Sequence, residues 1–155
     1  MNGKIMTLSD SAFFELWKAL PCGSAFCVEA SGRSMEPLFI NRCSRVFFTK
    51  PESGTAVKRG DVIIFTRQGL FPVLHRVFAI NCDGTLKVTG DAQTVFETVN
   101  KSEVCGIMTG FIRRRRYCTR KNILYRFYCG TWRFLFPLRG ALIKIYRKFL
   151  KLGEK

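Results

Sequence analysis

The sequence predicts a mainly β domain with a helix at each end, and three observations lead to that class. Several short runs rich in Val, Ile and Phe lie between residues 25 and 112. Turn-forming Gly, Asn and Asp residues separate these runs at intervals too short for βαβ crossovers. The segments before and after this region instead place apolar residues at helical spacing.

The composition supports a folded core, and the charge is unevenly distributed. Of the 155 residues, 47% are hydrophobic, which excludes a disordered basic tail. The net charge is +15, but residues 113–155 hold 14 basic side chains against one acidic side chain. Residues 1–112 hold the remaining 12 basic and 10 acidic side chains. A nearly neutral body is therefore expected to carry a strongly basic tail.

The chain is expected to divide into an N-terminal helix (1–23), a β domain (24–112) and a basic amphipathic C-terminal tail (113–155). Ser9 or Asp10 can cap the first helix, and Pro21 ends it. An Asn-Cys-Asp-Gly sequence at 81–84 predicts a hairpin turn. The strands are expected at residues 25–30, 45–49, 61–66, 73–80, 85–89 and 104–112.

The tail predicts an amphipathic helix over residues 138–152. One side is apolar and the opposite side is cationic, and Arg139 alone interrupts the apolar side. Such a helix suits the surface of an anionic membrane. Packing against the body or another protein is the alternative, and alternating Arg and aromatic residues also leave nucleic acid open. The apolar side includes Leu138, Leu142, Ile145 and Phe149, and the cationic side Lys144, Arg147 and Lys148.

The cysteines and the N-terminus indicate a reducing compartment without a membrane span. The seven cysteines form no Cys-x-x-Cys pair, so a disulfide framework and a zinc site are not expected, and most should be buried. Asp10 and Glu15 interrupt the first apolar stretch, which excludes a secretory signal, and no apolar run reaches about 20 residues. The expected location is the cytoplasm or the cytoplasmic face of a membrane, with no metal or cofactor.

One short segment, SGRSMEP at residues 31–37, surrounds a serine with residues that restrict the backbone. Gly32 permits a close approach of backbone to a substrate, and Pro37 fixes the chain that follows. Ser34 is therefore expected on a rigid bend. Taken alone, a serine in a loop of this kind is more often a simple turn residue.

Four further segments follow in order, and the five together resemble the signal peptidase I superfamily of serine peptidases. That superfamily also contains the LexA-like self-cleaving repressors, and the resemblance covers roughly residues 26–112. It implies their complex β-fold and a serine endopeptidase activity. The four segments are RGDVIIF (59–65), LHRV (74–77), TGDA (89–92) and VCGIMTG (104–110).

The resemblance implies Ser34 as nucleophile and His75 as general base. Common bacterial signal peptidases have a lysine at the place of His75, so the chain is similar to the Ser-His form of endoplasmic-reticulum-type signal peptidases. Neutral imidazole, with a pKa of about 6.5, is a suitable base for a serine hydroxyl, whereas Arg76 stays protonated. Asp91 is expected to orient His75. The alternatives are a histidine on a buried strand and a turn-forming aspartate.

Several residues depart from the pattern of these relatives. Ala92 replaces an asparagine, and Glu97 is a candidate for a second acidic residue. Gly32 replaces a serine that helps some relatives to bind the oxyanion, so the backbone N–H of Ser34 is expected to supply this contact. Met35 is expected beside the substrate cleft or in the core. The transmembrane anchor of the relatives has no counterpart in this sequence.

The expected function is a serine endopeptidase that cleaves a leader or signal segment through an acyl-enzyme. Its partners would be that peptide, bound as an extended strand at a sheet edge, and an anionic membrane surface contacted by residues 138–152. A self-cleaving regulator is disfavoured, because the segment before residue 25 is too short for a DNA-binding domain. A catalytically inactive peptide- or membrane-binding module with the same fold is the remaining alternative.

Overall fold

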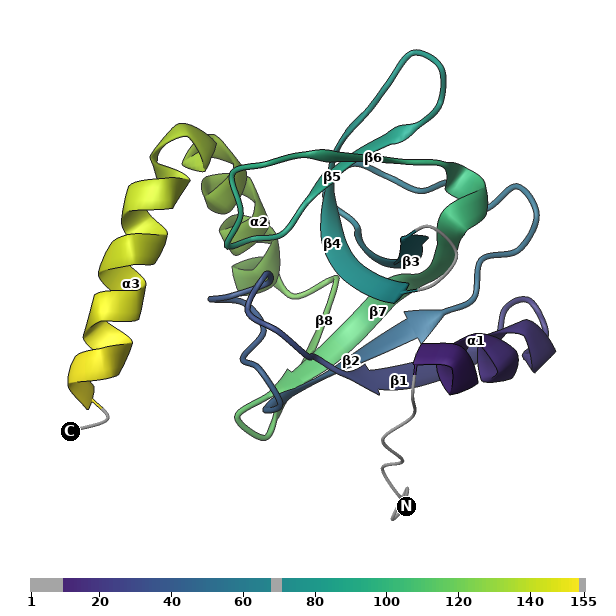
Figure 1. Cartoon of the computed structure of the whole chain (residues 1–155), viewed down its shortest axis with the longest axis horizontal. Coiled ribbons are helices and arrows are strands. Elements are labelled where there is room, and N and C mark those ends of the chain that lie inside the picture. Colours follow the sequence, from purple (N-terminus) through teal and green to yellow (C-terminus); the bar gives the residue numbers. More distant parts are fainter. Residues whose placement is uncertain (1–9, 68–70, 154–155) are drawn as a thin grey trace.

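The chain folds around one strongly curved sheet with helices at its two ends (Figure 1). The computed structural model describes residues 10–67 and 71–153, and its elements follow a simple order along the chain. They are α1 (Asp10–Ala19), β1 (Ala25–Glu29), β2 (Ser44–Thr49), β3 (Val62–Arg67), β4 (Phe71–Ile80), β5 (Leu86–Thr89), β6 (Glu97–Val99), β7 (Val104–Arg113), β8 (Arg116–Thr119), α2 (Ile123–Phe134) and α3 (Arg139–Gly153), with short 3₁₀ helices at Lys101–Glu103 and Phe136–Leu138.

All strand pairs are antiparallel, in the order β1-β2-β7-β3-β4-β5-β6, and β8 pairs with β7 outside this path. The mainly β class is confirmed, and each of the six expected strands is present with small shifts at its ends. The sequence missed β6, β8 and α2. The arginine run at 113–116 was expected to open the tail, but it turns the chain from β7 into β8, with Arg114 and Arg115 at φ of 48° and 66°.

Two apolar clusters lie on opposite faces of the sheet, and β3 and β7 supply both. The run Val62–Phe65 alternates between them, which explains why four consecutive apolar residues are all buried. The first core cluster includes Phe14, Met35, Phe39, Val46, Phe48, Val62, Ile64, Met108, Phe111 and Tyr125. The second includes Val57, Ile63, Phe65, Val77, Leu86, Val88, Val99, Val104 and Ile107.

Helix α1 closes one side of the first core cluster. Trp17 Nε1 donates a hydrogen bond of 2.8 Å to the carbonyl of Cys105 on β7. Lys50 Nζ donates to the carbonyls of Trp17 (2.9 Å) and Leu20 (2.6 Å), which satisfies backbone acceptors that the helix end leaves free. The proposed cap Ser9 lies outside the described residues.

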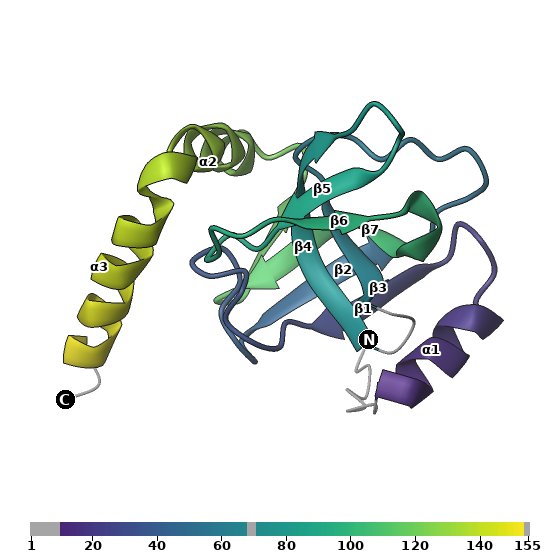
Figure 2. The same ribbon diagram turned by 45° about the horizontal axis from the view of Figure 1, so that its top comes forward.

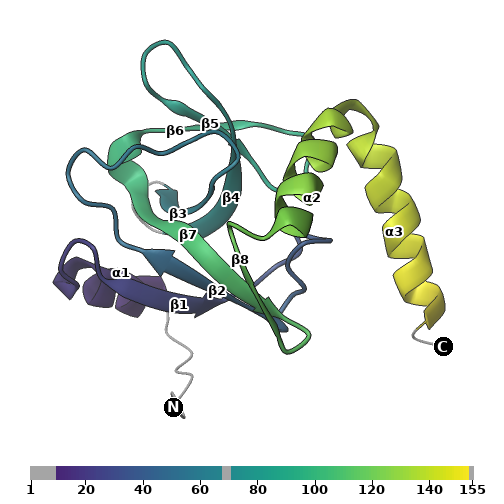
Figure 3. The ribbon, with the colours of Figure 1, turned by 180° about the vertical axis from the view of Figure 1, so that it is seen from behind.

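The C-terminal helices lie at the other end of the molecule, where α2 rests on the body and α3 extends beyond it (Figures 1 and 3). Tyr125 of α2 belongs to the first core cluster, so the tail is joined to the β domain by buried contacts. The helix expected at 138–152 is observed as α3. Among the described residues, no helix is long and apolar enough to cross a membrane.

The cysteines differ from expectation in their exposure. Only Cys105 is buried, whereas Cys22, Cys27, Cys43 and Cys82 are exposed. All seven cysteines are free thiols. The expectation that most are buried was wrong, because these four lie in turns or on outward-facing strand positions rather than between the sheet and its helices.

Candidate active site

Ser34 lies in a bend that its neighbours hold by backbone hydrogen bonds. Gly32 has a φ of 83°, a conformation that glycine adopts without strain, and its N–H donates to Asn41 Oδ1 at 2.9 Å. The N–H of Glu36 donates to the carbonyl of Arg33 at 3.3 Å, which closes a turn around Ser34. The expected bend at Ser34 is confirmed.

The bend packs directly against the turn that follows β5. The N–H of Ala92 donates to the Ser34 carbonyl at 2.7 Å. A Cβ at Gly90 would lie 2.5 Å from that carbonyl oxygen and 3.0 Å from Ser34 Cβ, so only glycine fits this position without movement. Gly90 is therefore the glycine that allows the two backbone segments to approach closely. Two of the sequence segments, SGRSMEP and TGDA, come together here.

His75 lies on β4, facing the second core cluster, with 1% of its surface exposed. Its ring centroid is 5.9 Å from that of Phe65. On the neighbouring strand Thr89 pairs with Arg76, so the next step of the antiparallel register brings Gly90 level with His75. The register and the Gly90 contact thus bring Ser34 to the stretch of β4 that carries the histidine.

The acidic side chain against His75 is Glu97, at the start of β6. Its Oε1 lies 3.3 Å from His75 Nδ1, but the alignment falls short of a hydrogen bond, and Nδ1 is buried without a partner. Arg67 donates three hydrogen bonds of 2.6 to 3.0 Å to the same carboxylate. Burial lowers the pKa of His75 to about 4; the carboxylates of Glu97 and Asp91 oppose this, and Arg67 adds to it. The imidazole is therefore neutral at pH 7.

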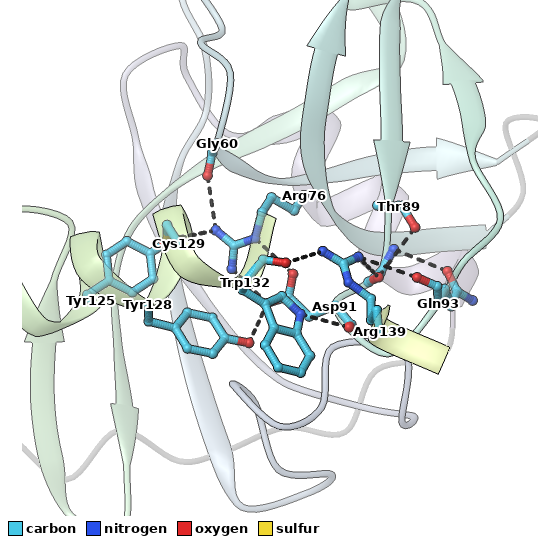
Figure 4. A network of polar contacts seen from close by, with 11 residues as sticks. Gly60, Arg76, Thr89, Asp91, Gln93, Tyr125, Tyr128, Cys129, Trp132 and Arg139 are labelled. Carbon is cyan, nitrogen blue, oxygen red and sulfur yellow. Dashed lines mark hydrogen bonds and ion pairs between the residues drawn. The ribbon is translucent and has the colours of Figure 1, made fainter. Parts of the chain in front are cut away.

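Asp91 was expected to orient His75, and its contacts do not fit that role. Its carboxylate is completely buried and accepts two hydrogen bonds from Arg76, at 2.8 and 2.7 Å (Figure 4). Burial alone would lower the pKa of Arg76, but the Asp91 carboxylate outweighs it and raises that pKa. Side chains alternate along β4, so Arg76 points to the opposite face from His75. Asp91, which is bound to Arg76, therefore lies on that face as well.

The buried Arg76–Asp91 pair also joins the tail to the turn beside Ser34. Tyr128 Oη donates to Asp91 Oδ2 at 3.1 Å, and Trp132 Nε1 donates to the Asp91 carbonyl at 2.9 Å (Figure 4). Arg139, which is 2% exposed, donates to the carbonyls of Gly90 (3.2 Å), Gln93 (3.3 Å) and Trp132 (3.2 Å). This explains the cation on the apolar side of the predicted helix, because Arg139 binds backbone acceptors.

The remaining expected site residues are placed less favourably. Met35 is buried in the first core cluster, which fits the core alternative rather than a cleft. Among the described residues, no hydrogen bond joins Ser34 Oγ to His75, and none engages the Ser34 N–H. Asp61 has a structural role, because it accepts from the Lys58 N–H at 2.9 Å and pairs with Arg120.

A shallow depression of about 520 Å³ lies beside this region, between the 92–95 turn and β6. Glu97 lines it and also faces His75, while Ala92 lines it and also holds Ser34. Neither Ser34 nor His75 lines it, so it is linked to them only through Ala92 and Glu97. Its lining is Arg67, Ala92, Gln93, Thr94, Val95 and Glu97.

Within residues 10–67 and 71–153, no cluster of three or more His, Cys, Asp or Glu side chains could hold a metal ion. Sequence reasoning named Glu97 as a candidate second acid, and its position against His75 makes it the nearest acidic group to the imidazole. The tail residues that bind Asp91 were missed, because their spacing resembles that of any amphipathic helix. No protein-family model matches the chain, and no curated protein matches it.

Proposed function

We propose that the protein is a serine endopeptidase with a signal-peptidase-like fold, cleaving a leader or signal segment from a peptide or protein. The observation that carries the proposal is the packing of Ser34 against Gly90, level with a buried neutral His75 whose Nδ1 faces Glu97. The resemblance of five ordered segments to the superfamily supports the same assignment. Two of these segments, SGRSMEP and TGDA, come from distant parts of the chain and are in contact.

The proposed reaction passes through an acyl-enzyme. Ser34 Oγ attacks the carbonyl carbon of the scissile peptide bond while His75 Nε2 removes the hydroxyl proton. The Ser34 N–H donates to the resulting oxyanion. The C–N bond then breaks, the leaving amine takes the proton from His75, and an ester remains on Ser34. Water, deprotonated by His75, hydrolyses that ester and restores the serine.

In this scheme Glu97 rather than Asp91 orients the base. When His75 takes the serine proton, the Glu97 carboxylate 3.3 Å from Nδ1 stabilises the imidazolium. Arg67 fixes the carboxylate from the other side. Asp91 is a positioning residue, since it holds the turn against which Ser34 packs.

The substrate is proposed to bind in the depression beside Glu97. Strand β6 stands at one end of the strand order and, within the described residues, pairs only with β5, so its other edge offers backbone groups to an extended peptide. Side chains of that peptide would lie over the depression of about 520 Å³. A leader segment in extended conformation suits such an edge.

A fluorophosphonate probe tests the nucleophile directly. The wild type and the Ser31→Ala variant, altered in the same loop, should be labelled, and Ser34→Ala should not. His75→Gln should lose labelling by two or more orders of magnitude, since the base contributes roughly 10²–10⁴-fold. Labelling that persists in Ser34→Ala would remove Ser34 as the nucleophile.

One observation favours a second candidate, a peptide-binding module without catalysis. Ser34 Oγ and His75 make no hydrogen bond with each other in the described residues, and Nδ1 has no partner. Catalytic hydrogen bonds are often loose before substrate binds, so the missing contact does not displace the peptidase as the first candidate. Peptide binding without any probe labelling of the folded wild type would favour the module.

A further inference from the structure

The last two helices expose an unusual amount of apolar surface. Of the thirteen large hydrophobic side chains that are exposed in the described residues, eight lie between residues 123 and 150. Soluble surfaces rarely keep contiguous apolar patches of this kind without a partner. The eight are Ile123, Leu124, Phe127, Phe134, Leu138, Ile145, Phe149 and Leu150.

Helix α2 is apolar on two opposite sides. Tyr125, Tyr128 and Trp132 face the body, where they contact Arg76 and Asp91. At 100° per residue, the outward side carries Phe127 and Phe134, which are 73% and 84% exposed. Arg126 and Arg133 lie together on the remaining side, so the apolar side of α2 is unusually wide.

Helix α3 continues the pattern of exposed apolar side chains after the 3₁₀ helix at Phe136–Leu138. Leu138 ends the preceding 3₁₀ helix, and Ile145 and Phe149 follow along one side of α3, where Phe149 is 70% exposed. At 100° per residue, Lys148 and Lys144 lie about 80° and 120° around the helix from the centre of this stripe, and both are exposed. The helix stands away from the sheet in two views that differ by a turn about the horizontal axis (Figures 1 and 2).

The charge around these stripes is of one sign. No acidic residue occurs between Glu103 and Glu154. Among the residues whose exposure is described, the exposed cations of the two helices and of the residues just before α2 are Lys121, Arg126, Lys144, Arg147 and Lys148. Residues 1–112 are nearly neutral, so the excess positive charge lies in the β7–β8 hairpin, with its arginine run at 113–116, and in the segment that holds α2 and α3.

We propose that the outward sides of α2 and α3 form one docking surface for an anionic phospholipid bilayer. Aromatic and aliphatic side chains enter the headgroup region, and the adjacent lysines and arginines contact lipid phosphates. A second copy of the chain fits poorly, because it would oppose cations to cations with no acidic residue between them. Nucleic acid would leave the exposed Phe, Ile and Leu side chains in water.

Sedimentation of the full chain with vesicles tests the surface. Vesicles of phosphatidylcholine containing phosphatidylglycerol should bind the protein, and phosphatidylcholine alone should bind it weakly. Lys144→Gln with Lys148→Gln should weaken binding by roughly thirtyfold, about fivefold for each cation. Phe134→Ser with Phe149→Ser should weaken it by about a hundredfold or more. All four side chains are exposed, so the variants should fold.

Matched substitutions elsewhere provide the controls. Leu16→Ser removes an exposed apolar side chain from α1, and Lys58→Gln with Arg59→Gln removes two exposed cations from a loop. Both should leave vesicle binding unchanged. Equal loss in the controls, or full binding by the α2–α3 variants, would overturn the proposal.

Two other outcomes would also overturn it. One is a dimer in solution that Phe134→Ser with Phe149→Ser dissociates, without vesicle binding by the wild type. The other is tight binding to RNA with none to anionic vesicles. Binding is measured without turnover, so a failure here leaves Ser34 labelling unaffected, and a failure of labelling leaves the membrane result standing.

Discussion

The single histidine makes the protonation of the proposed base directly measurable. In the folded protein the pKa of His75 is about 4, lowered chiefly by burial, whereas an unfolded chain has a value of about 6.5. Between these values the unfolded state binds a proton that the folded state does not. The contribution of His75 to stability is therefore complete above pH 6.5 and is lost as the pH falls towards 4.

The size of this effect follows from the two pKa values. Lowering the pH from 7 to 5 should reduce the unfolding free energy by about 2 kcal/mol through His75, with a limit of about 3 kcal/mol near pH 4. Urea denaturation of the wild type measures the total loss. The same experiment on His75→Gln measures the part due to carboxylates, and the difference isolates the imidazole.

Nuclear magnetic resonance of the imidazole gives the folded pKa without any variant, because only one histidine contributes. The signals should keep their neutral positions from pH 8 down to about 5. Proteolytic or probe-labelling activity should likewise persist well below pH 6. A folded pKa at or above 6.5, or the same pH dependence in both proteins, would refute burial as the controlling influence on His75.

Three further substitutions test the packing around the site. Asp91→Asn should lower the unfolding free energy by about 3–5 kcal/mol in urea denaturation, because it leaves the Arg76 guanidinium buried without its carboxylate. A change below 1 kcal/mol would contradict a buried ion pair. Gly90→Ala should destabilise by roughly 1–3 kcal/mol and slow probe labelling, since the new Cβ would meet the Ser34 carbonyl. Normal labelling with unchanged stability would show that the bend is not packed there. Lys50→Met should increase hydrogen exchange in α1, whose carbonyls lose a charged donor worth about 1.5–3 kcal/mol. Unchanged exchange would mean that α1 is held without Lys50.

The sequence predicted the strands that carry long apolar runs, and it missed the elements with weaker local signals. Strand β6 has three residues, too few to show alternation. The turn before β8 uses Arg114 and Arg115 at positive φ, where glycine or asparagine would have been the visible signal. Helix α2 is the exception: its residues have amphipathic spacing, with Arg126 and Arg133 on one side, and the sequence reading overlooked it.

For the candidate site, the sequence singled out segments and residues but did not show which side chains touch. The loop of Ser34 contacts the turn after β5. Which acidic residue meets His75 follows from the alternation of side chains along β4. Arg76 and His75 are adjacent, so they point to opposite faces of the sheet. Asp91 follows Arg76 to one face and Glu97 meets His75 on the other. Spacing alone does not reveal this division.

The strand partners of β7 determine how the sheet can unfold. It pairs with β2 along one edge and with both β3 and β8 along the other, and its side chains enter both core clusters. Neither half of the sheet can separate without breaking its ladder. Backbone amides of β7 should therefore exchange only through global unfolding, and the body should melt as a single cooperative unit while α3 frays independently.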